Sequence, residues 1–217
     1  LTVGTDYTVV YENNIEVGTA TVTITGIGNY GGTVSKTFNI LFKDVLAGHQ
    51  FYDPIYWMVG KGITTGWADG TFRPWNTCNR AACVTFLWRM AGRPEPHSVA
   101  GFTDMPENTE TNQDFRKAIS WAVEEGITTG WADNTFRPWK TCNRAAIMTF
   151  IWRYAGKPAA STPSGFSDQT GNPDFDAAIA WASEKGIANG YSDGTFGPWK
   201  ACNRGAIAAF LYRYGTK

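Results

Sequence analysis

The sequence of 217 residues has no excess of charge of one sign and no long apolar run. Lysine and arginine (19 together) balance aspartate and glutamate (19 together), and no basic cluster is present. Nucleic-acid-binding surfaces depend on such clusters, and a membrane-spanning helix needs about 20 consecutive apolar residues. We therefore expect neither nucleic-acid binding nor membrane insertion. No signal peptide precedes Leu1, but the chain begins inside a patterned segment, so we interpret it as an internal fragment and draw no conclusion about export.

Residues and motifs of catalytic sites are scarce as well. The two histidines, His49 and His97, do not recur in the chain, and neither GxSxG nor HExxH is present. Three glutamates, Glu124, Glu125 and Glu184, fall near the exposed end of predicted helices, where we expect solvation rather than acid–base chemistry. The Asp-Gly pairs lack the further carboxylates of an EF-hand calcium loop. We expect a protein that is not an enzyme and has no cofactor or metal ion.

Cysteine is limited to four residues, and three of them, Cys78, Cys142 and Cys202, occupy one recurring position before an Asn-Arg pair. A disulfide between two equivalent cysteines would leave the third unmatched. CxxC spacing is absent and neither histidine recurs, which disfavours a zinc site. We expect these residues and Cys83 to be free thiols that are buried as small apolar side chains.

One stretch of 21 residues is present three times. GITTGWADGTFRPWNTCNRAA (62–82) returns as GITTGWADNTFRPWKTCNRAA (126–146) and as GIANGYSDGTFGPWKACNRGA (186–206). The arginines of the three copies, Arg80, Arg144 and Arg204, are therefore 64 and 60 residues apart. Self-similarity at a fixed period is the signature of a repeat architecture, so the chain should consist mainly of one structural unit in three copies.

Each copy has the pattern of a helix, a structured loop and a second helix. The first helix follows a Phe-x-Asp motif and ends before a glycine placed as a helix C′ residue. An Asp-Gly or Asp-Asn pair marks the tip of the loop, and asparagine there fits a left-handed backbone conformation. Another asparagine then caps the second helix. The C′ glycines are Gly62, Gly126 and Gly186, and the caps are Asn79, Asn143 and Asn203.

No single copy can bury its apolar face alone, so the three copies should pack together. We predict a mainly α fold of three helix-loop-helix repeats at 41–92, 101–156 and 165–217. Residues 1–40 differ, because they contain neither tryptophan nor cysteine. Their alternation of apolar residues with threonine predicts strands over 6–11, 20–25 and 34–40.

This short N-terminal β segment resembles the C-terminal half of the small immunoglobulin-like β modules of bacterial surface proteins. The resemblance rests on GTDYTVVYENN, on GTATVTITGIGNYGGT and on the closing F-x-I. We interpret the segment as part of a spacer.

The repeats resemble the S-layer homology (SLH) domain. The resemblance rests on F-x-D, on a helix that ends in G-I, on G-[WY]-x-D-G-T-F-x-P, and on a six-residue step from this proline to the arginine. It implies pseudo-threefold packing and non-covalent anchoring of an exported bacterial protein to a secondary cell-wall polysaccharide, in many members a pyruvylated one. It also implies a location outside the cell, at the cell wall or S-layer. Where the family has T-R-A-E, these copies have NRAA, NRAA and NRGA, so the asparagine can cap but no glutamate returns the bond.

The candidate ligand-binding residues recur in all three copies. Arg80, Arg144 and Arg204 stand at helix N-termini, where the guanidinium fork, the backbone amides and the helix dipole all favour an anion such as a carboxylate. The alternative is that each arginine binds loop carbonyls. Aromatic rings at the loop tip could stack on a sugar or cover the loop, and aspartates there could accept sugar hydroxyls or form the turn. These residues are Trp67, Trp131, Tyr191, Asp69, Asp133 and Asp193.

Two further expectations concern the differences between the copies and the alternative function. In the third copy, Gly197 replaces Arg73 and Arg137, which predicts a weaker or vacant third site. We expect the tryptophans after the repeated proline, Trp75, Trp139 and Trp199, to be packing residues. The alternative to glycan binding is a structural module that self-associates into a surface layer, which predicts concentration-dependent assembly without any glycan.

Overall fold

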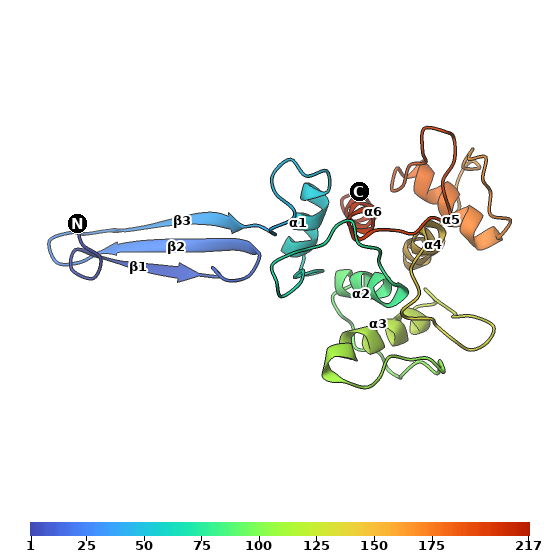
Figure 1. The fold of residues 1–217 in the computed structure, drawn as a ribbon, viewed down its shortest axis with the longest axis horizontal. Coiled ribbons are helices and arrows are strands. Elements are labelled where there is room, and N and C mark those ends of the chain that lie inside the picture. Colours follow the sequence, from blue (N-terminus) through green and yellow to red (C-terminus); the bar gives the residue numbers. More distant parts are fainter. The chain divides into compact units, whose positions relative to one another are not determined.

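The computed structural model describes all residues from 1 to 217, and Figure 1 labels its elements. The chain divides into two compact units, Leu1–Arg73 and Pro74–Lys217, with the division inside the first predicted repeat. No helix is long and apolar enough to span a membrane. In chain order the elements are β1 (Tyr7–Glu12), β2 (Gly18–Gly26), β3 (Thr33–Ile40), α1 (Tyr52–Gly60), α2 (Arg80–Met90), η1 (Glu110–Asn112), α3 (Gln113–Glu124), α4 (Arg144–Tyr154), α5 (Pro173–Glu184) and α6 (Arg204–Gly215).

The first unit contains a three-stranded antiparallel sheet in the order β1-β2-β3, which confirms the three predicted strands. The register places Val9 opposite Ile24 and Ile24 opposite Val34, so apolar side chains share one face. Threonines dominate the other face, because successive side chains of a strand point to opposite sides. Much of the apolar face is exposed, with Tyr11 at 55% and Phe38 at 42%.

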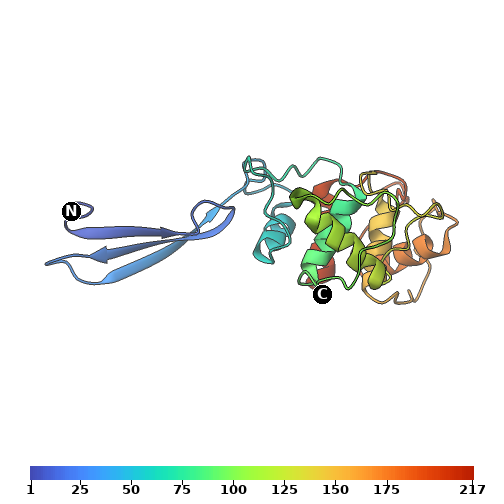
Figure 2. The ribbon, with the colours of Figure 1, turned by 90° about the horizontal axis from the view of Figure 1, so that it is seen from below.

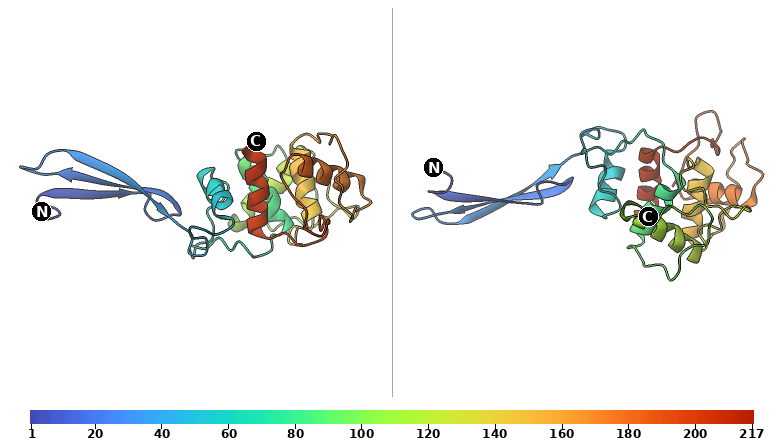
Figure 3. Two further views of the ribbon diagram at one scale, coloured as in Figure 1. Left: turned by 90° about the horizontal axis from the view of Figure 1, so that it is seen from above. Right: turned by 60° about the horizontal axis from the view of Figure 1, so that its bottom comes forward.

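The second unit is built around three helices, α2, α4 and α6, which lie side by side in every view (Figures 1 to 3). Helix α3 packs against α2, and α5 packs against α4 (Figure 1). Leu87, Ile151 and Leu211 occupy the same position of the three central helices, and each is completely buried. Apolar residues surround these helices on most sides, as expected for helices in the middle of a core.

Recurring residues fix the ends of the helices as predicted. Asn143 accepts a hydrogen bond from the Ala146 amide (2.8 Å), and the equivalent caps begin α2 and α6. Helix α3 ends one residue before Gly126, whose φ of 65° lies in the left-handed region that glycine adopts without strain. Asn134, at the tip of the middle loop, also has a left-handed φ of 59°.

The N-terminal ends of α2, α4 and α6 meet in a ring of backbone hydrogen bonds. The Cys78 amide donates to the Cys202 carbonyl (3.0 Å), the Cys202 amide to the Cys142 carbonyl (2.9 Å), and the Cys142 amide to the Cys78 carbonyl (2.8 Å). All four cysteines are free and buried, as predicted. The recurring Cys-Asn pair therefore joins the three copies through its backbone, while the thiol fills the core.

The Phe-x-Asp motif holds the loop between the two helices of each copy. In the second copy, the two carboxylate oxygens of Asp104 accept the amides of Phe136 (2.8 Å) and Arg137 (2.7 Å). The ring of Phe102 lies directly under Gly130, where a Cβ atom would be only 2.2 Å from a ring carbon. Only glycine fits there, which explains why this position is glycine in all three copies. Asp44 and Asp168 make the equivalent amide bonds.

The linkers between copies are attached by two of the glutamates at the ends of the first helices. Glu124 accepts the amides of His97 (3.1 Å) and Ser98 (2.8 Å), and Glu184 accepts the amide of Ser161 (2.5 Å). These backbone bonds lower the pKa of both carboxyl groups. The two glutamates are exposed, as expected, but they bind the linkers as well as solvent.

Candidate functional site

A groove of about 410 Å³ lies in the second unit, between the N-terminus of α2, the loop before α4, helix α4 and the N-terminus of α5. Its walls come from all three predicted repeats, because residue 80, residues 128–153 and residues 172–175 contribute to it. Its size is in the range of sites for small molecules. The polar and aromatic residues that line it include Arg80, Thr128, Trp131, Thr149, Arg153 and Asp174.

Arg80 is held at the groove by its own neck. Its Nε donates to the Phe136 carbonyl (2.9 Å), and its guanidinium carbon lies 4.7 Å from the centre of the Phe136 ring and 5.2 Å from that of Phe150. The side chain is 8% exposed, and burial lowers its pKa, although a guanidinium remains charged at neutral pH. Because only Nε is used in this bond, the two terminal nitrogens remain to bind a ligand.

The backbone amides beside Arg80 are not available to a ligand. The amides of Arg80 and Ala81 donate to the carbonyls of Lys140 (3.0 Å) and Pro138 (2.9 Å), and Asn79 caps the next amide (2.8 Å). Equivalent bonds occupy the first turns of α4 and α6. The expectation that these amides help to bind an anion is therefore wrong, because they bind the neighbouring copy instead.

A second arginine lines the groove and was not among the predicted site residues. Arg153 donates to the Ile127 carbonyl (3.2 Å) and forms an ion pair with Asp174 (2.5 Å), while its buried Nε has no hydrogen-bond partner. Arg80, Arg153 and Asp174 together leave one positive charge in the groove. The sequence does contain a signal for Arg153, because an arginine recurs nine residues after each NR pair, at 89, 153 and 213.

The other two predicted arginines lie elsewhere and have different surroundings. Arg144 is buried and donates to two carbonyls, those of Phe196 (2.9 Å) and Asn189 (3.0 Å). Arg204 is partly exposed, and its guanidinium carbon is 5.5 Å from the centre of the Phe86 ring. The structure therefore does not bring the three arginines together; each contacts the core of another copy. The carbonyl-binding alternative describes Arg144 best.

The aromatic residues at the loop tips already carry cations over their rings. The cation-to-centroid distances are 4.2 Å for Arg73 over Trp67, 4.1 Å for Arg137 over Trp131 and 4.0 Å for Lys200 over Tyr191. Lys140 also lies 4.8 Å from the Trp131 ring centre. Trp131 lines the groove with 41% of its surface exposed, but the cations compete with a sugar for its ring faces.

The aspartates at the loop tips form the turns. Asp133 accepts the amide (3.2 Å) and hydroxyl (2.5 Å) of Thr135 and an Arg137 nitrogen (2.9 Å). The threonine and arginine bonds lower the pKa of Asp133, and the same partners lower that of Asp69 to about 2. In the third copy Asp193 keeps the threonine bonds, which also lower its pKa. Asp133 does not line the groove.

The tryptophans that follow the repeated proline differ from the prediction. Trp75, Trp139 and Trp199 are 60%, 55% and 60% exposed, so they are not core packing residues. Trp139 and Trp199 each make an edge-to-face contact with a phenylalanine of the first helix, at centroid distances of 5.4 Å to Phe115 and 5.7 Å to Phe175. These rings lie on the surface, where the backbone ring holds the preceding proline.

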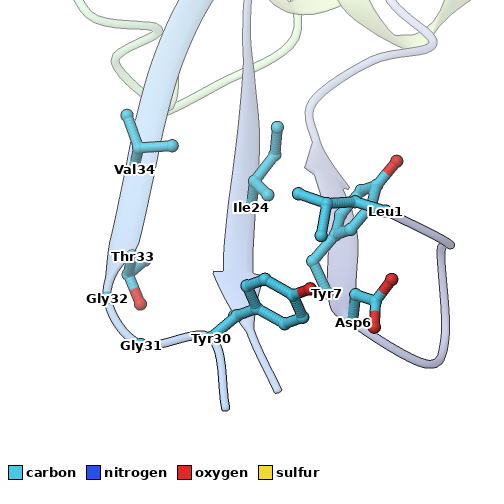
Figure 4. Close-up of a pocket in the computed structure, with 10 residues that line it drawn as sticks. Leu1, Asp6, Tyr7, Ile24, Tyr30, Gly31, Gly32, Thr33 and Val34 are labelled. Atoms are coloured by element: carbon cyan, nitrogen blue, oxygen red, sulfur yellow. The ribbon is translucent and has the colours of Figure 1, made fainter. Parts of the chain in front are cut away.

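Another hollow, of about 590 Å³, lies on the sheet of the first unit. Figure 4 shows Ile24 and Val34 on neighbouring strands, with Tyr30 in the turn beside them. Its single charged side chain, Asp6, accepts the Thr2 amide (2.7 Å) and so stabilises the local turn. This hollow belongs to the exposed apolar face of the sheet and has no converging polar groups, so it is not a candidate site for a polar ligand.

A family model described as "S-layer homology domain" matches residues 41–82, 111–147 and 165–208, which is more than half of the chain. Three similar proteins carry surface-protein names. They are "Cell surface glycoprotein 1" of Acetivibrio thermocellus (28% identical over 70% of this chain), the "S-layer protein" of Bacillus licheniformis (26% over 78%) and the "Cellulosome-anchoring protein" of Acetivibrio thermocellus (27% over 65%). The matched region covers 7%, 19% and 32% of these relatives, respectively, so the chain corresponds to a minor part of each.

Proposed function

Because the chain belongs to the S-layer homology domain family, which supports cell-surface anchoring or S-layer association, we propose that it binds a secondary cell-wall polysaccharide non-covalently. The family and the relatives indicate an extracellular location at the cell surface. The parent protein would be retained at the wall by this contact. We expect no catalytic activity, which an assay for sugars released from purified wall material would test.

The observation that carries the proposal is the groove around Arg80. Its Nε bond to Phe136 fixes the guanidinium before a ligand arrives, so little conformational entropy is lost on binding. The terminal nitrogens form a planar fork that suits a carboxylate, such as that of a pyruvylated sugar. Thr128 and Thr149 line the same groove, as groups of the kind that hydrogen-bond sugar hydroxyls. The net positive charge of the groove favours an anionic glycan over a neutral one.

We also propose that the three repeats pack with pseudo-threefold symmetry around the Cys78, Cys142 and Cys202 ring. The three backbone bonds in that ring and the three equivalent bonds from Arg80, Arg144 and Arg204 to the neighbouring copy support this arrangement. Pseudosymmetry predicts up to three grooves. Residues 1–40 would then be a spacer that precedes the binding body.

The test is co-sedimentation with purified Gram-positive wall sacculi, before and after acid removal of the secondary polymers. We expect binding that is lost when the polymers are removed. Arg80→Ala should weaken it by about tenfold or more, because truncating a buried, charged anchor of an interface commonly costs over 2 kcal/mol. Arg80→Lys should be intermediate, since lysine keeps the charge but not the planar fork.

A second pair of variants separates binding from stability. Thr129 is exposed and lines the groove, so Thr129→Trp should fill the groove without removing any hydrogen bond of the fold. Ala132→Trp is the matched control, because Ala132 is exposed nearby but does not line the groove. Loss of binding in the first variant alone would support the proposal. Equal binding by both variants and the wild type would exclude this groove as the site.

Self-assembly is the second candidate function, and the exposed apolar face of the sheet favours it. Tyr11, Phe38 and Val34 are each more than 40% exposed on that face. Sedimentation velocity without any glycan would test this candidate, with association that rises with protein concentration as the expected result. A monomer at all concentrations would exclude it.

A further inference from the structure

We propose that Trp199, supported by Phe175, is a second subsite of the groove that stacks on the sugar adjacent to the anionic one. This inference rests on the proposed function, because it assumes that the groove binds a glycan. It assigns the stacking role to an exposed ring that follows the repeated proline, and not to the loop-tip ring of Trp131.

Two independent contacts place Trp199 at the edge of the groove. Its ring makes an edge-to-face contact with Phe175, and Phe175 is part of the groove wall. The preceding residue, Pro198, accepts the amide of Ala145 (2.9 Å), and the next residue, Ala146, lines the groove. Trp199 itself does not line the groove, so its ring extends the wall outward.

The ring of Trp199 is also better suited to stacking than that of Trp131. Arg137 and Lys140 lie 4.1 Å and 4.8 Å from the centre of the Trp131 ring, and a sugar would have to displace them to stack there. Trp199 is 60% exposed, compared with 41% for Trp131. A tryptophan that is held at its edge and exposed over most of its surface is a rigid platform, which binds with little loss of side-chain freedom.

A polymeric ligand explains why such a platform is useful. A groove of about 410 Å³ can enclose only a short part of a polysaccharide, so the chain must leave it across an edge. With the anionic sugar bound by Arg80, the next sugar would meet the ring beside Phe175. The same Trp-Phe pair recurs as Trp139 and Phe115 in the second copy, so the arrangement is a repeated feature of the body.

The probes are a synthetic pyruvylated N-acetylhexosamine and the disaccharide that joins it to a second N-acetylhexosamine. Titrations followed through the amide resonances of Thr128 and Ala146 report on this groove alone, because both residues line it. For the wild type we expect the disaccharide to bind about tenfold more tightly than the monosaccharide, which is the usual scale for one aromatic anchor. Trp199→Ala should abolish this difference and leave the monosaccharide affinity unchanged. Trp199→Phe should keep most of the difference.

Trp139→Ala is the matched control, because Trp139 is equally exposed on its own phenylalanine and lies outside this groove. It should leave both affinities at this groove unchanged. Disaccharide binding by Trp199→Ala that equals the wild type would overturn the inference while the proposed function stands. Failure of the wild type to bind either sugar would overturn the proposed function and this inference with it. Amide spectra of each variant establish that it is folded.

Discussion

Arg144→Ala should destabilise the second unit more than any other replacement of a repeated arginine at a helix start that we can derive from the structure. Arg144 is 9% exposed and donates to the carbonyls of Phe196 and Asn189 at 2.9 and 3.0 Å. A hydrogen bond from a charged group contributes about 1.5–3 kcal/mol, and the truncation also leaves two carbonyls without this donor. We therefore expect a loss of about 3–5 kcal/mol in the free energy of unfolding.

Arg80→Ala provides the internal comparison, because Arg80 makes one such bond, to Phe136, where Arg144 makes two. Its expected cost is about 1.5–3 kcal/mol. Denaturant titration followed by far-ultraviolet circular dichroism measures both. At about 2–4 °C per kcal/mol, the melting temperature should fall by about 10 °C for Arg144→Ala and by about half of that for Arg80→Ala.

Arg137→Gly is the control for removing a repeated arginine that the fold does not need. Its ion pair with Asp133 is exposed and should contribute less than about 1 kcal/mol. Its φ of 59° favours glycine, which is the residue that the third copy has at this position, so the net change should be within about 1 kcal/mol. An Arg144→Ala protein as stable as Arg137→Gly would refute the assignment of Arg144 to the scaffold and return it to the list of candidate ligand-binding residues.

The remaining predictions concern caps, thiols and acid. Asn143→Ala removes the α4 cap and should cost about 1 kcal/mol in the same titration, whereas Asn143→Ser should cost only a few tenths, and equal stability of the Ala variant would contradict the cap. Burial raises the pKa of Cys83 and raises that of Cys202 to about 12, so a disulfide reagent at neutral pH should label these thiols only after unfolding; rapid labelling of the native protein would contradict their burial. The Thr71 bond and then the Arg73 bond lower the pKa of Asp69 from 3.8 to about 2, so its stabilising effect is complete above pH 3.8 and is lost as the pH falls through about 2. The Thr71 amide resonance should therefore titrate with a midpoint near 2, and a midpoint near 3.8 would contradict the turn geometry.

Local features followed directly from the sequence because each depends on a few adjacent residues. The asparagine caps, the C′ glycines and the left-handed Asn134 were all predicted correctly, since caps and tight turns need particular side chains at particular backbone angles. The three strands of the β segment were also found where the alternation of apolar residues and threonine placed them. The family resemblance was confirmed by the match to residues 41–82, 111–147 and 165–208.

The use of the repeated polar groups was decided only by tertiary structure. Sequence placed Arg80 and Arg144 in the same motif, but the carbonyls around them differ because neighbouring copies present different loops. The amides at the helix starts looked available for an anion, yet each binds a carbonyl 58 or more residues distant or, in the case of Arg144, 56 residues distant. No local pattern records such contacts between copies.

The groove has the same origin. Arg80, Trp131 and Asp174 come from three copies, and they approach one another only because the Cys78, Cys142 and Cys202 backbone ring brings the helix starts together. By itself the sequence determined the unit, its caps, its turns and its family, because these depend on short-range conformational preferences. The tertiary structure alone decided which arginine lines a groove and which one is part of the scaffold, because that depends on where the next copy places its carbonyl groups.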